Sequence, residues 1–229
     1  MKREVVGSMS EWSGVLKDLF RQIDDGSIGL GHIQALLERR DPFAAESFQG
    51  LVTEWEGFYQ DTFGIKADFS NLRIPEKQPG FNRLIIMAEG MTPQRLYDKC
   101  GEFFACWKWT GDSLDNVVAY SERTSKNGAY AVWVRDRVEA DEEFKKLSAD
   151  EIKAKNINTE TLEERFIHEL KYFRETRAHL DLRNITLCAG SRDSDGDVPS
   201  VRWGSDKLGV DWYDPDLTSD FLRPRQVVS

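Results

Sequence analysis

Arginine and carboxylate side chains follow four short apolar segments of the chain, and these are the residues whose types and spacing best suit chemistry. Each apolar segment is typical of a buried strand, and the polar residues come directly after it. The candidate ligand-binding residues at these positions are Glu89, Asp112, Arg135, Asp136, Arg137 and Arg192. Arginine binds phosphate or carboxylate through paired hydrogen bonds, and a neighbouring carboxylate can hold Mg²⁺ or act as a general base.

These residues form one site only if the four strands are parallel neighbours. The apolar segments cover residues 84–88, 106–109, 129–134 and 184–189. Ligands of open parallel sheets bind beyond the carboxyl ends of the strands. If the four ends meet at one edge, guanidinium and carboxylate groups converge on a pocket for a small anionic ligand. The structural alternative is a set of polar strand ends with ordinary Arg–Asp ion pairs.

Three aspartates at alternate positions, Asp193, Asp195 and Asp197, could serve as hard oxygen ligands for a metal ion. An EF-hand is not indicated, because valine and glycine stand where that loop needs glycine and glutamate. The alternative is a polar hairpin turn in which Asp195-Gly196 supplies positive φ angles. We favour the turn and expect no cofactor, with Mg²⁺ or Ca²⁺ at these carboxylates as the alternative.

The cysteines and histidines lack catalytic or metal-binding spacing. Cys100, Cys106 and Cys188 are odd in number and contain no Cys-x-x-Cys pair, which argues against a disulfide framework or a zinc site. They favour a reducing, cytoplasmic setting. His168 and His179 lie eleven residues apart, and we expect them to be solvated or to cap helices.

Composition limits the classes of function. The 229 residues include 31 basic and 40 acidic side chains, which gives a net charge of −9. Hydrophobic residues make up 40% of the chain, enough for a packed core and too many for a disordered protein. The acidic excess argues against nucleic acid as a partner. No membrane association is expected, because no apolar run approaches the roughly 18 residues of a membrane span.

The pattern divides the chain into three parts. They are an N-terminal helical portion over 1–63, a linker or extended crossing segment over 64–80, and an α/β domain over 81–229 that ends in a β-meander. In the first part, Ser8 and Glu11 have the spacing of a capping box for a helix that ends near Ile23. Two further helices are predicted in this part, over residues 30–39 and 43–61.

The α/β domain begins with strand 84–88, a helix that opens at Thr92-Pro93, and strand 106–109. This order is typical of a right-handed parallel unit. Segment 129–134 is predicted as a second buried strand, whereas 114–120 fits a helix or a strand.

The rest of the domain is predicted to contain three helices and three strands. A helix is expected over 140–146, and complete start signals open two more at Ser148 with Glu151 and at Thr161 with Glu164. An antiparallel meander is predicted over residues 184–189, 198–203 and 208–213. The fold class is therefore α/β or α+β, with a mixed central β-sheet, packed helices and an N-terminal helical portion.

The stretch from Asn127 to Glu143, NGAYAVWVRDRVEADEE, resembles a group of uncharacterised bacterial hypothetical proteins. The likeness extends to TLCAGSR at residues 186–192 and to the Asp-Gly-Asp turn that follows. It covers most of the chain beyond Pro75. The resemblance implies a shared fold and carries over no activity and no catalytic residues.

Three classes of function are open. A binding protein for a small anionic ligand would use the arginines named above. A Mg²⁺-dependent phosphoryl-transfer or hydrolytic enzyme would add the carboxylates of Asp112, Asp136 and Asp193. A non-catalytic interaction module would offer its N-terminal helices to a protein partner. We favour a ligand or a protein partner over catalysis, because no nucleophile–base pair is evident.

Overall fold

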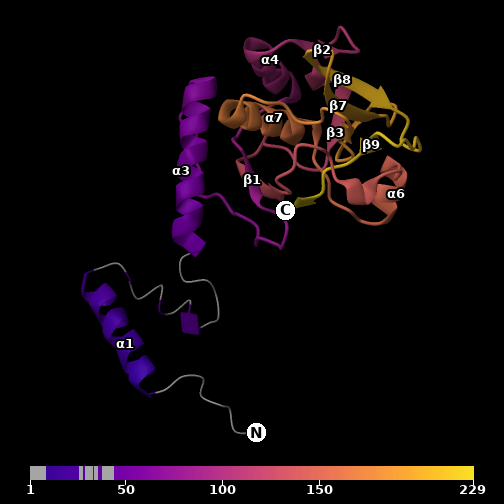
Figure 1. Ribbon diagram of the computed structural model, residues 1–229. Helices are drawn as coiled ribbons and strands as arrows, with labels where there is room; N and C mark the ends of the chain where they lie inside the picture. The colour runs from indigo at the N-terminus through magenta and orange to yellow at the C-terminus, as the bar shows by residue number, and fades with distance from the viewer. Residues whose placement is uncertain (1–8, 26–27, 29–32, 34–35, 38–43) are drawn as a thin grey trace. The chain divides into compact units, whose positions relative to one another are not determined.

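The computed structural model describes residues 9–25, 28, 33, 36–37 and 44–229. It divides into two compact units, Met1–Thr53 and Glu54–Ser229. In the first unit, α1 (Met9–Asp24) is the helix predicted to end near Ile23 (Figure 1). The predicted cap at Ser8 lies outside the described residues, as does most of the predicted helix over 30–39.

The second unit begins within α3 (Ala44–Phe63), which corresponds to the helix predicted over 43–61. The aromatic side chains of its last turns are buried in this unit. The Tyr59 hydroxyl donates to the carbonyl oxygen of Ile86 at 2.8 Å and accepts from the amide of Ala88 at 2.9 Å. These two bonds satisfy a buried polar group and attach the helix to the adjoining strand.

Residues 64–80 have no helix or strand and cross the second unit in an extended form. Phe69 is buried, and it packs edge-on against Tyr59 with 5.8 Å between ring centroids. Farther along, the indole nitrogen of Trp133 donates to the carbonyl oxygen of Pro75 at 2.9 Å. The segment is therefore held against the domain at two points.

A three-stranded antiparallel sheet holds the most apolar strands. Its strand order is β1-β4-β10, with β1 (Arg83–Met87), β4 (Tyr130–Val134) and β10 (Val227–Val228). Arg83 lies opposite Val134, and Met87 lies opposite Tyr130. The two strands predicted from continuous apolar runs, β1 and β4, are confirmed as strands, and the structure makes them direct neighbours.

A five-stranded mixed sheet holds the C-terminal meander. Its strand order is β2-β8-β7-β5-β9, with β2 (Cys106–Lys108), β8 (Lys207–Tyr213), β7 (Val198–Gly204), β5 (Ile185–Leu187) and β9 (Leu222–Arg223). The pairs β5–β7 and β7–β8 are antiparallel, which confirms the predicted meander. The pairs β2–β8 and β5–β9 are parallel. The fold is therefore of the mixed α/β or α+β class.

The predicted parallel unit of 84–88, helix and 106–109 is wrong, because β1 and β2 lie in different sheets. The helix between them, α4 (Pro93–Phe103), begins where expected, with Thr92 as N-cap accepting from the amide of Arg95. The apolar partner of β1 is β4, which the chain supplies later and in the antiparallel direction. Local pattern identifies each strand, but a strand's partner depends on the whole core.

Segment 114–120, which fits a helix or a strand by its sequence, contains one of each. α5 (Leu114–Val117) is one short turn, and β3 (Val118–Ser121) follows it without a break. β3 pairs antiparallel with β6 (Ser191–Asp193) in a separate two-stranded sheet.

Both predicted capping boxes are confirmed, at α6 (Ala149–Ala154) and α7 (Leu162–Thr176). The helix expected over 140–146 is wrong, since only a 3₁₀ turn, η1 (Glu142–Phe144), forms there. The reason is that Asp141 is buried and accepts hydrogen bonds from Arg135 and from the amide of Gln226, which holds the chain out of a solvated helix.

The long helix α7 packs against α4, β1 and β7 and so lies between the two larger sheets (Figure 1). Ten consecutive residues of it, from Leu162 to Lys171, are buried, and six of them are ionisable. The prediction that His168 and His179 are solvated or capping is wrong. His168 lies in the buried part of the helix with its Nδ1 atom 2.8 Å from Glu160, and His179, beyond the helix, lies 2.9 Å from a carboxylate oxygen of Glu169 and stacks on Trp203. Among the described helices, none combines the length and apolar character needed to cross a membrane.

The backbone at Gly190 passes too close to the start of α7 for any side chain. A Cβ there would stand 2.9 Å from the carbonyl oxygen of Thr159 and 3.2 Å from that of Glu160. Gly190→Ala is expected to lower the free energy of unfolding by about 1–3 kcal/mol, measured by urea denaturation. Gly101→Ala is the control, because its Cβ would meet nothing within 4 Å in helix α4. An equal effect of both substitutions would contradict the steric argument.

Candidate functional site

The structure separates the residues that the sequence analysis placed at one sheet edge. Arg135, Asp136 and Arg137 follow β4 at the end where Val134 lies opposite Arg83. Because β1 runs antiparallel to β4, Glu89 follows β1 at the other end of that sheet. Asp112 follows β2 in the five-stranded sheet, and Arg192 lies in β6 of the two-stranded sheet. The six residues therefore belong to three sheets and share no single edge.

The predicted arginines already have partners. Arg135 lies 2.7 Å from Asp141 and 2.9 Å from the side-chain oxygen of Gln226. Arg137 donates to both oxygens of Glu143, at 2.7 and 2.9 Å, and this bond lowers the pKa of Glu143 to about 2. Arg192 donates to the carbonyl oxygens of Ala189 and Ser191. The contacts of Arg135 and Arg137 match the structural alternative of ordinary ion pairs, whereas Arg192 is bound by backbone carbonyls.

The three aspartates of the predicted metal site form a turn. One carboxylate oxygen of Asp193 accepts hydrogen bonds from the amides of Asp195 and Asp197, both at 2.9 Å. Gly196 has a φ of 95°, which is the positive angle expected from the Asp-Gly pair. Within the described residues, no group of three or more His, Cys, Asp or Glu is arranged to hold a metal ion.

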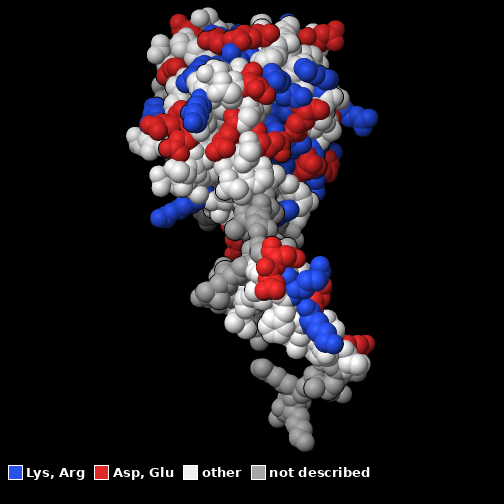
Figure 2. Space-filling model, turned by 90° about the vertical axis from the view of Figure 1, so that its left-hand side faces the viewer, with Lys and Arg blue, Asp and Glu red and all other residues white. Residues whose placement is uncertain are grey.

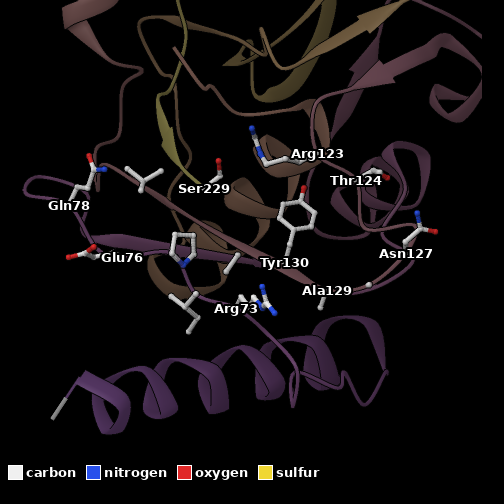
Figure 3. A pocket seen from close by; sticks show the side chains of 14 residues that line it. Arg73, Glu76, Gln78, Arg123, Thr124, Asn127, Ala129, Tyr130 and Ser229 are labelled. Atoms are coloured by element: carbon white, nitrogen blue, oxygen red, sulfur yellow. The ribbon is translucent and has the colours of Figure 1, made fainter. Parts of the chain in front are cut away.

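A cavity of about 670 Å³ lies elsewhere, where three separate segments meet (Figure 3). Residues 73–78 of the extended segment line one part of it, and residues 123–131, between β3 and the start of β4, line another. Val228 and Ser229, at the end of β10, complete it. Its volume lies in the range of small-molecule sites.

Arg73 is the cation in this lining that has no partner. Its side chain is exposed and makes no ion pair with any described residue. By contrast, Arg123 is bound to Glu164, with its Nε and Nη2 atoms 2.7 and 2.8 Å from the two carboxylate oxygens. Arg123 therefore serves as a fixed wall of the cavity, and Arg73 is the charge that is available to a ligand.

Tyr130 forms another wall of the cavity. Its ring stands in the middle of the lining with the hydroxyl toward Arg123 (Figure 3). The hydroxyl is buried and has no hydrogen-bond partner among the described residues. Burial and the carboxylates of Glu164 and Glu163 raise the pKa of Tyr130, so the phenol stays protonated and can donate. Because the hydroxyl is buried beside the Glu164 carboxylate, Tyr130 forms a wall of the cavity, and Arg73 is the donor that a ligand can reach.

The remaining lining combines apolar surface with neutral hydrogen-bonding groups. Ile74, Pro75, Ala131 and Val228 are apolar, whereas the amides and hydroxyls come from other positions: Gln78, Thr124, Asn127 and Ser229. Its described residues include one acidic side chain, Glu76, and no histidine or cysteine. This composition suits binding of a small molecule through an anionic group and lacks a nucleophile–base pair.

Sequence reasoning missed this cavity because its residues do not follow strands in one sheet. Arg73 comes from the segment that was considered a linker, and Arg123 precedes an unassigned loop. One signal was present: Asn127-Gly128 directly precedes the strand predicted over 129–134 and belongs to the stretch that carries the family resemblance.

Comparisons with known proteins give no functional assignment, so the function is argued from the geometry of the cavity. No protein family, curated protein or solved structure matches the chain. The resemblance to a group of bacterial hypothetical proteins stays a prediction.

Proposed function

We propose that the protein binds a small ligand carrying a carboxylate or phosphate group in the cavity between residues 73–78, 123–131 and 228–229. The proposal depends on which charged side chains of the cavity lining already have partners. Arg73 is an exposed donor without an ion-pair partner among the described residues, whereas Arg123 is neutralised by Glu164. A ligand anion beside Arg73 gains a charge-assisted hydrogen bond, and its apolar part lies against Ile74 and Val228.

The mixed surface charge and the free cysteines agree with a small-molecule ligand and a reducing compartment. Acidic and basic side chains are intermixed over the face in Figure 2, an arrangement that does not favour a polyanion such as nucleic acid. Cys100, Cys106 and Cys188 are all free thiols, as expected of a protein in a reducing cytoplasm. We place the proposed binding activity in that compartment.

The test is thermal stabilisation by small anions. The probes are inorganic phosphate, succinate and glucose 6-phosphate, with glucose as the uncharged counterpart. At least one of the three anions is expected to raise the melting temperature, because a ligand that binds only the folded state stabilises it. Arg73→Gln is expected to weaken that binding about tenfold or more, since it removes the unpaired charge.

Lys66→Gln is the matched control. It removes one exposed positive charge from the same extended segment without touching the cavity. Stabilisation that is equal for glucose and its phosphate, or equally weakened by both substitutions, would contradict the proposal.

A protein partner on α1 is a second candidate. Val15, Leu16, Phe20 and Ile23 are exposed along one side of this helix, and Phe20 exposes 65% of its surface. Exposed apolar stripes of this kind are typical of helices that dock on another surface.

A further inference from the structure

The five-stranded sheet has an outward face that is only half covered. On this face, Val198 and Leu187 are buried beneath Ala149 and Ile152 of α6, in a small separate core. Side chains alternate along a strand, so Ser200, Arg202 and Gly204 of β7 point to the same side as Val198. That part of the face has no helix over it among the described residues.

A groove follows the uncovered half. A cavity of about 660 Å³ adjoins a smaller one of about 70 Å³, and both are lined by Ile185, Arg202, Gly204 and Tyr213. Neither shares a residue with the cavity around Arg73. The groove is therefore separate from the cavity of the proposed function, and ligand binding to it can be tested independently.

The wall of the groove is apolar and exposed to solvent. Leu182 and Phe221 expose 55% and 60% of their surface, and Leu217 exposes 39%. All three line the larger cavity, together with Tyr213. Clustered apolar side chains left in water indicate a binding surface more often than scattered single ones do.

The two arginines of the larger cavity have no direct partner in the described part of the chain, although Asp211 lines the smaller cavity. Arg183 and Arg202 line the larger cavity, and its described lining contains no aspartate or glutamate. Neither guanidinium group forms an ion pair or hydrogen bond with a described residue, although the backbone amide of Arg183 binds Glu139. The arginines that follow β4 are instead held by Asp141 and Glu143. In a chain with a net charge of −9, two unpaired arginines beside apolar side chains form a local match for an anion.

We propose that this groove binds a free amphipathic anion, a molecule that joins an apolar chain or ring to one carboxylate. The apolar part lies against Leu182, Leu217 and Phe221, where burial removes exposed hydrocarbon from water. The carboxylate lies between Arg183 and Arg202, and guanidinium groups bind carboxylates through paired hydrogen bonds. Gly204 also lines the groove, and a Cβ there would stand 4.0 Å from the Nε atom of Arg202.

The probe is decanoate, with decanol as its uncharged counterpart. Titration of the ¹⁵N-labelled full chain with decanoate is expected to shift the amide resonances of Ile185, Gly204 and Leu222, and the dissociation constant follows from the same titration. Decanol is expected to bind at least tenfold more weakly, because the carboxylate contacts are lost.

Two variants decide the role of the charges. Arg202→Gln is expected to weaken decanoate binding about tenfold and leave decanol binding unchanged. Lys153→Gln, which removes an exposed charge from α6 outside the groove, is expected to change neither. The proposal is overturned if decanoate shifts only the resonances of α1, if decanol binds equally well, or if only an acidic apolar peptide shifts the groove resonances.

Discussion

Asp181→Asn is expected to lower the free energy of unfolding by about 3–5 kcal/mol, the largest stability effect that we predict for a single side chain. Asp181 is fully buried, and its carboxylate lies 2.8 Å from Arg165 and 2.6 Å from Arg225. It also accepts from the Thr186 hydroxyl and the Ala140 amide. An uncharged side chain there leaves two buried guanidinium groups without this shared counter-ion.

The electrostatics of Asp181 support that expectation. Burial alone raises the pKa of this carboxyl, but the guanidinium groups of Arg225 and Arg165 outweigh burial and hold the pKa below its ordinary value. The carboxylate is therefore a bound counter-ion at neutral pH. Its protonation in acid removes the same stability, because a depressed pKa in the folded state favours folding only while the group is ionised.

Asp136→Asn is the matched control, measured by the same urea denaturation at pH 7. Asp136 pairs with Arg83 at 2.8 Å, but 54% of its side chain is exposed, so its loss is expected to cost less than about 1 kcal/mol. Similar losses for both variants would show that the buried charges around Asp181 contribute no more than a surface pair.

The second large effect concerns Glu160, whose substitution by glutamine should change how stability depends on pH. Glu160 is fully buried, and one carboxylate oxygen lies 2.8 Å from the Nδ1 atom of His168. Burial raises the pKa of Glu160 to about 7, against the partly offsetting charges of Arg225 and Arg165. Between pH 4.5 and 7 the folded protein therefore keeps a proton that the unfolded chain has lost.

The sign follows from that difference in bound protons. As pH rises from 4.5 to 7, Glu160 contributes a loss of stability of about 3 kcal/mol, because its ionised form is disfavoured in the folded state. His168 acts in the opposite direction: burial lowers its pKa, so its contribution falls as pH drops below 6.5. Glu160→Gln removes the first contribution and keeps the second.

Urea denaturation at several pH values measures this effect. Relative to the unaltered protein, Glu160→Gln is expected to gain about 3 kcal/mol between pH 4.5 and 7.5. Glu102→Gln, at an exposed position, controls for the removal of a carboxyl group. Parallel pH profiles for the unaltered protein and Glu160→Gln would rule out the raised pKa.

Local signals in the sequence predict the elements of this fold well. The capping boxes at Ser148 and Thr161 and the Thr92-Pro93 start depend only on residues within one helical turn, and all three helices begin there. Pairing is different, because the partner of a strand is chosen by burial across the whole domain. β1 therefore pairs with β4 and not with β2, and the two-residue strands β9 and β10 are too short to show a pattern.

The same dependence on contacts across the whole domain explains why the candidate site could not be predicted from the sequence. Arg135, Arg137 and Asp136 were reasonable candidates by type, but the structure pairs each with an opposite charge or amide nearby. Whether a charge is paired depends on tertiary contacts that no local spacing records. Arg73 is available because the extended segment places it at a cavity, and Tyr130 lacks a partner because of its depth, not its neighbours in sequence.

The most direct test of the central claim is a map of ligand contacts around Arg73. ¹⁵N amide resonances of the full chain are followed during titration with inorganic phosphate, succinate and glucose 6-phosphate. The account predicts saturable shifts at Arg73, Gln78, Asn127 and Ala131 for at least one anion, and their loss in Arg73→Gln but not in Lys66→Gln. Shifts confined to the ion pairs after β4, or none at any residue that lines the cavity, would contradict it.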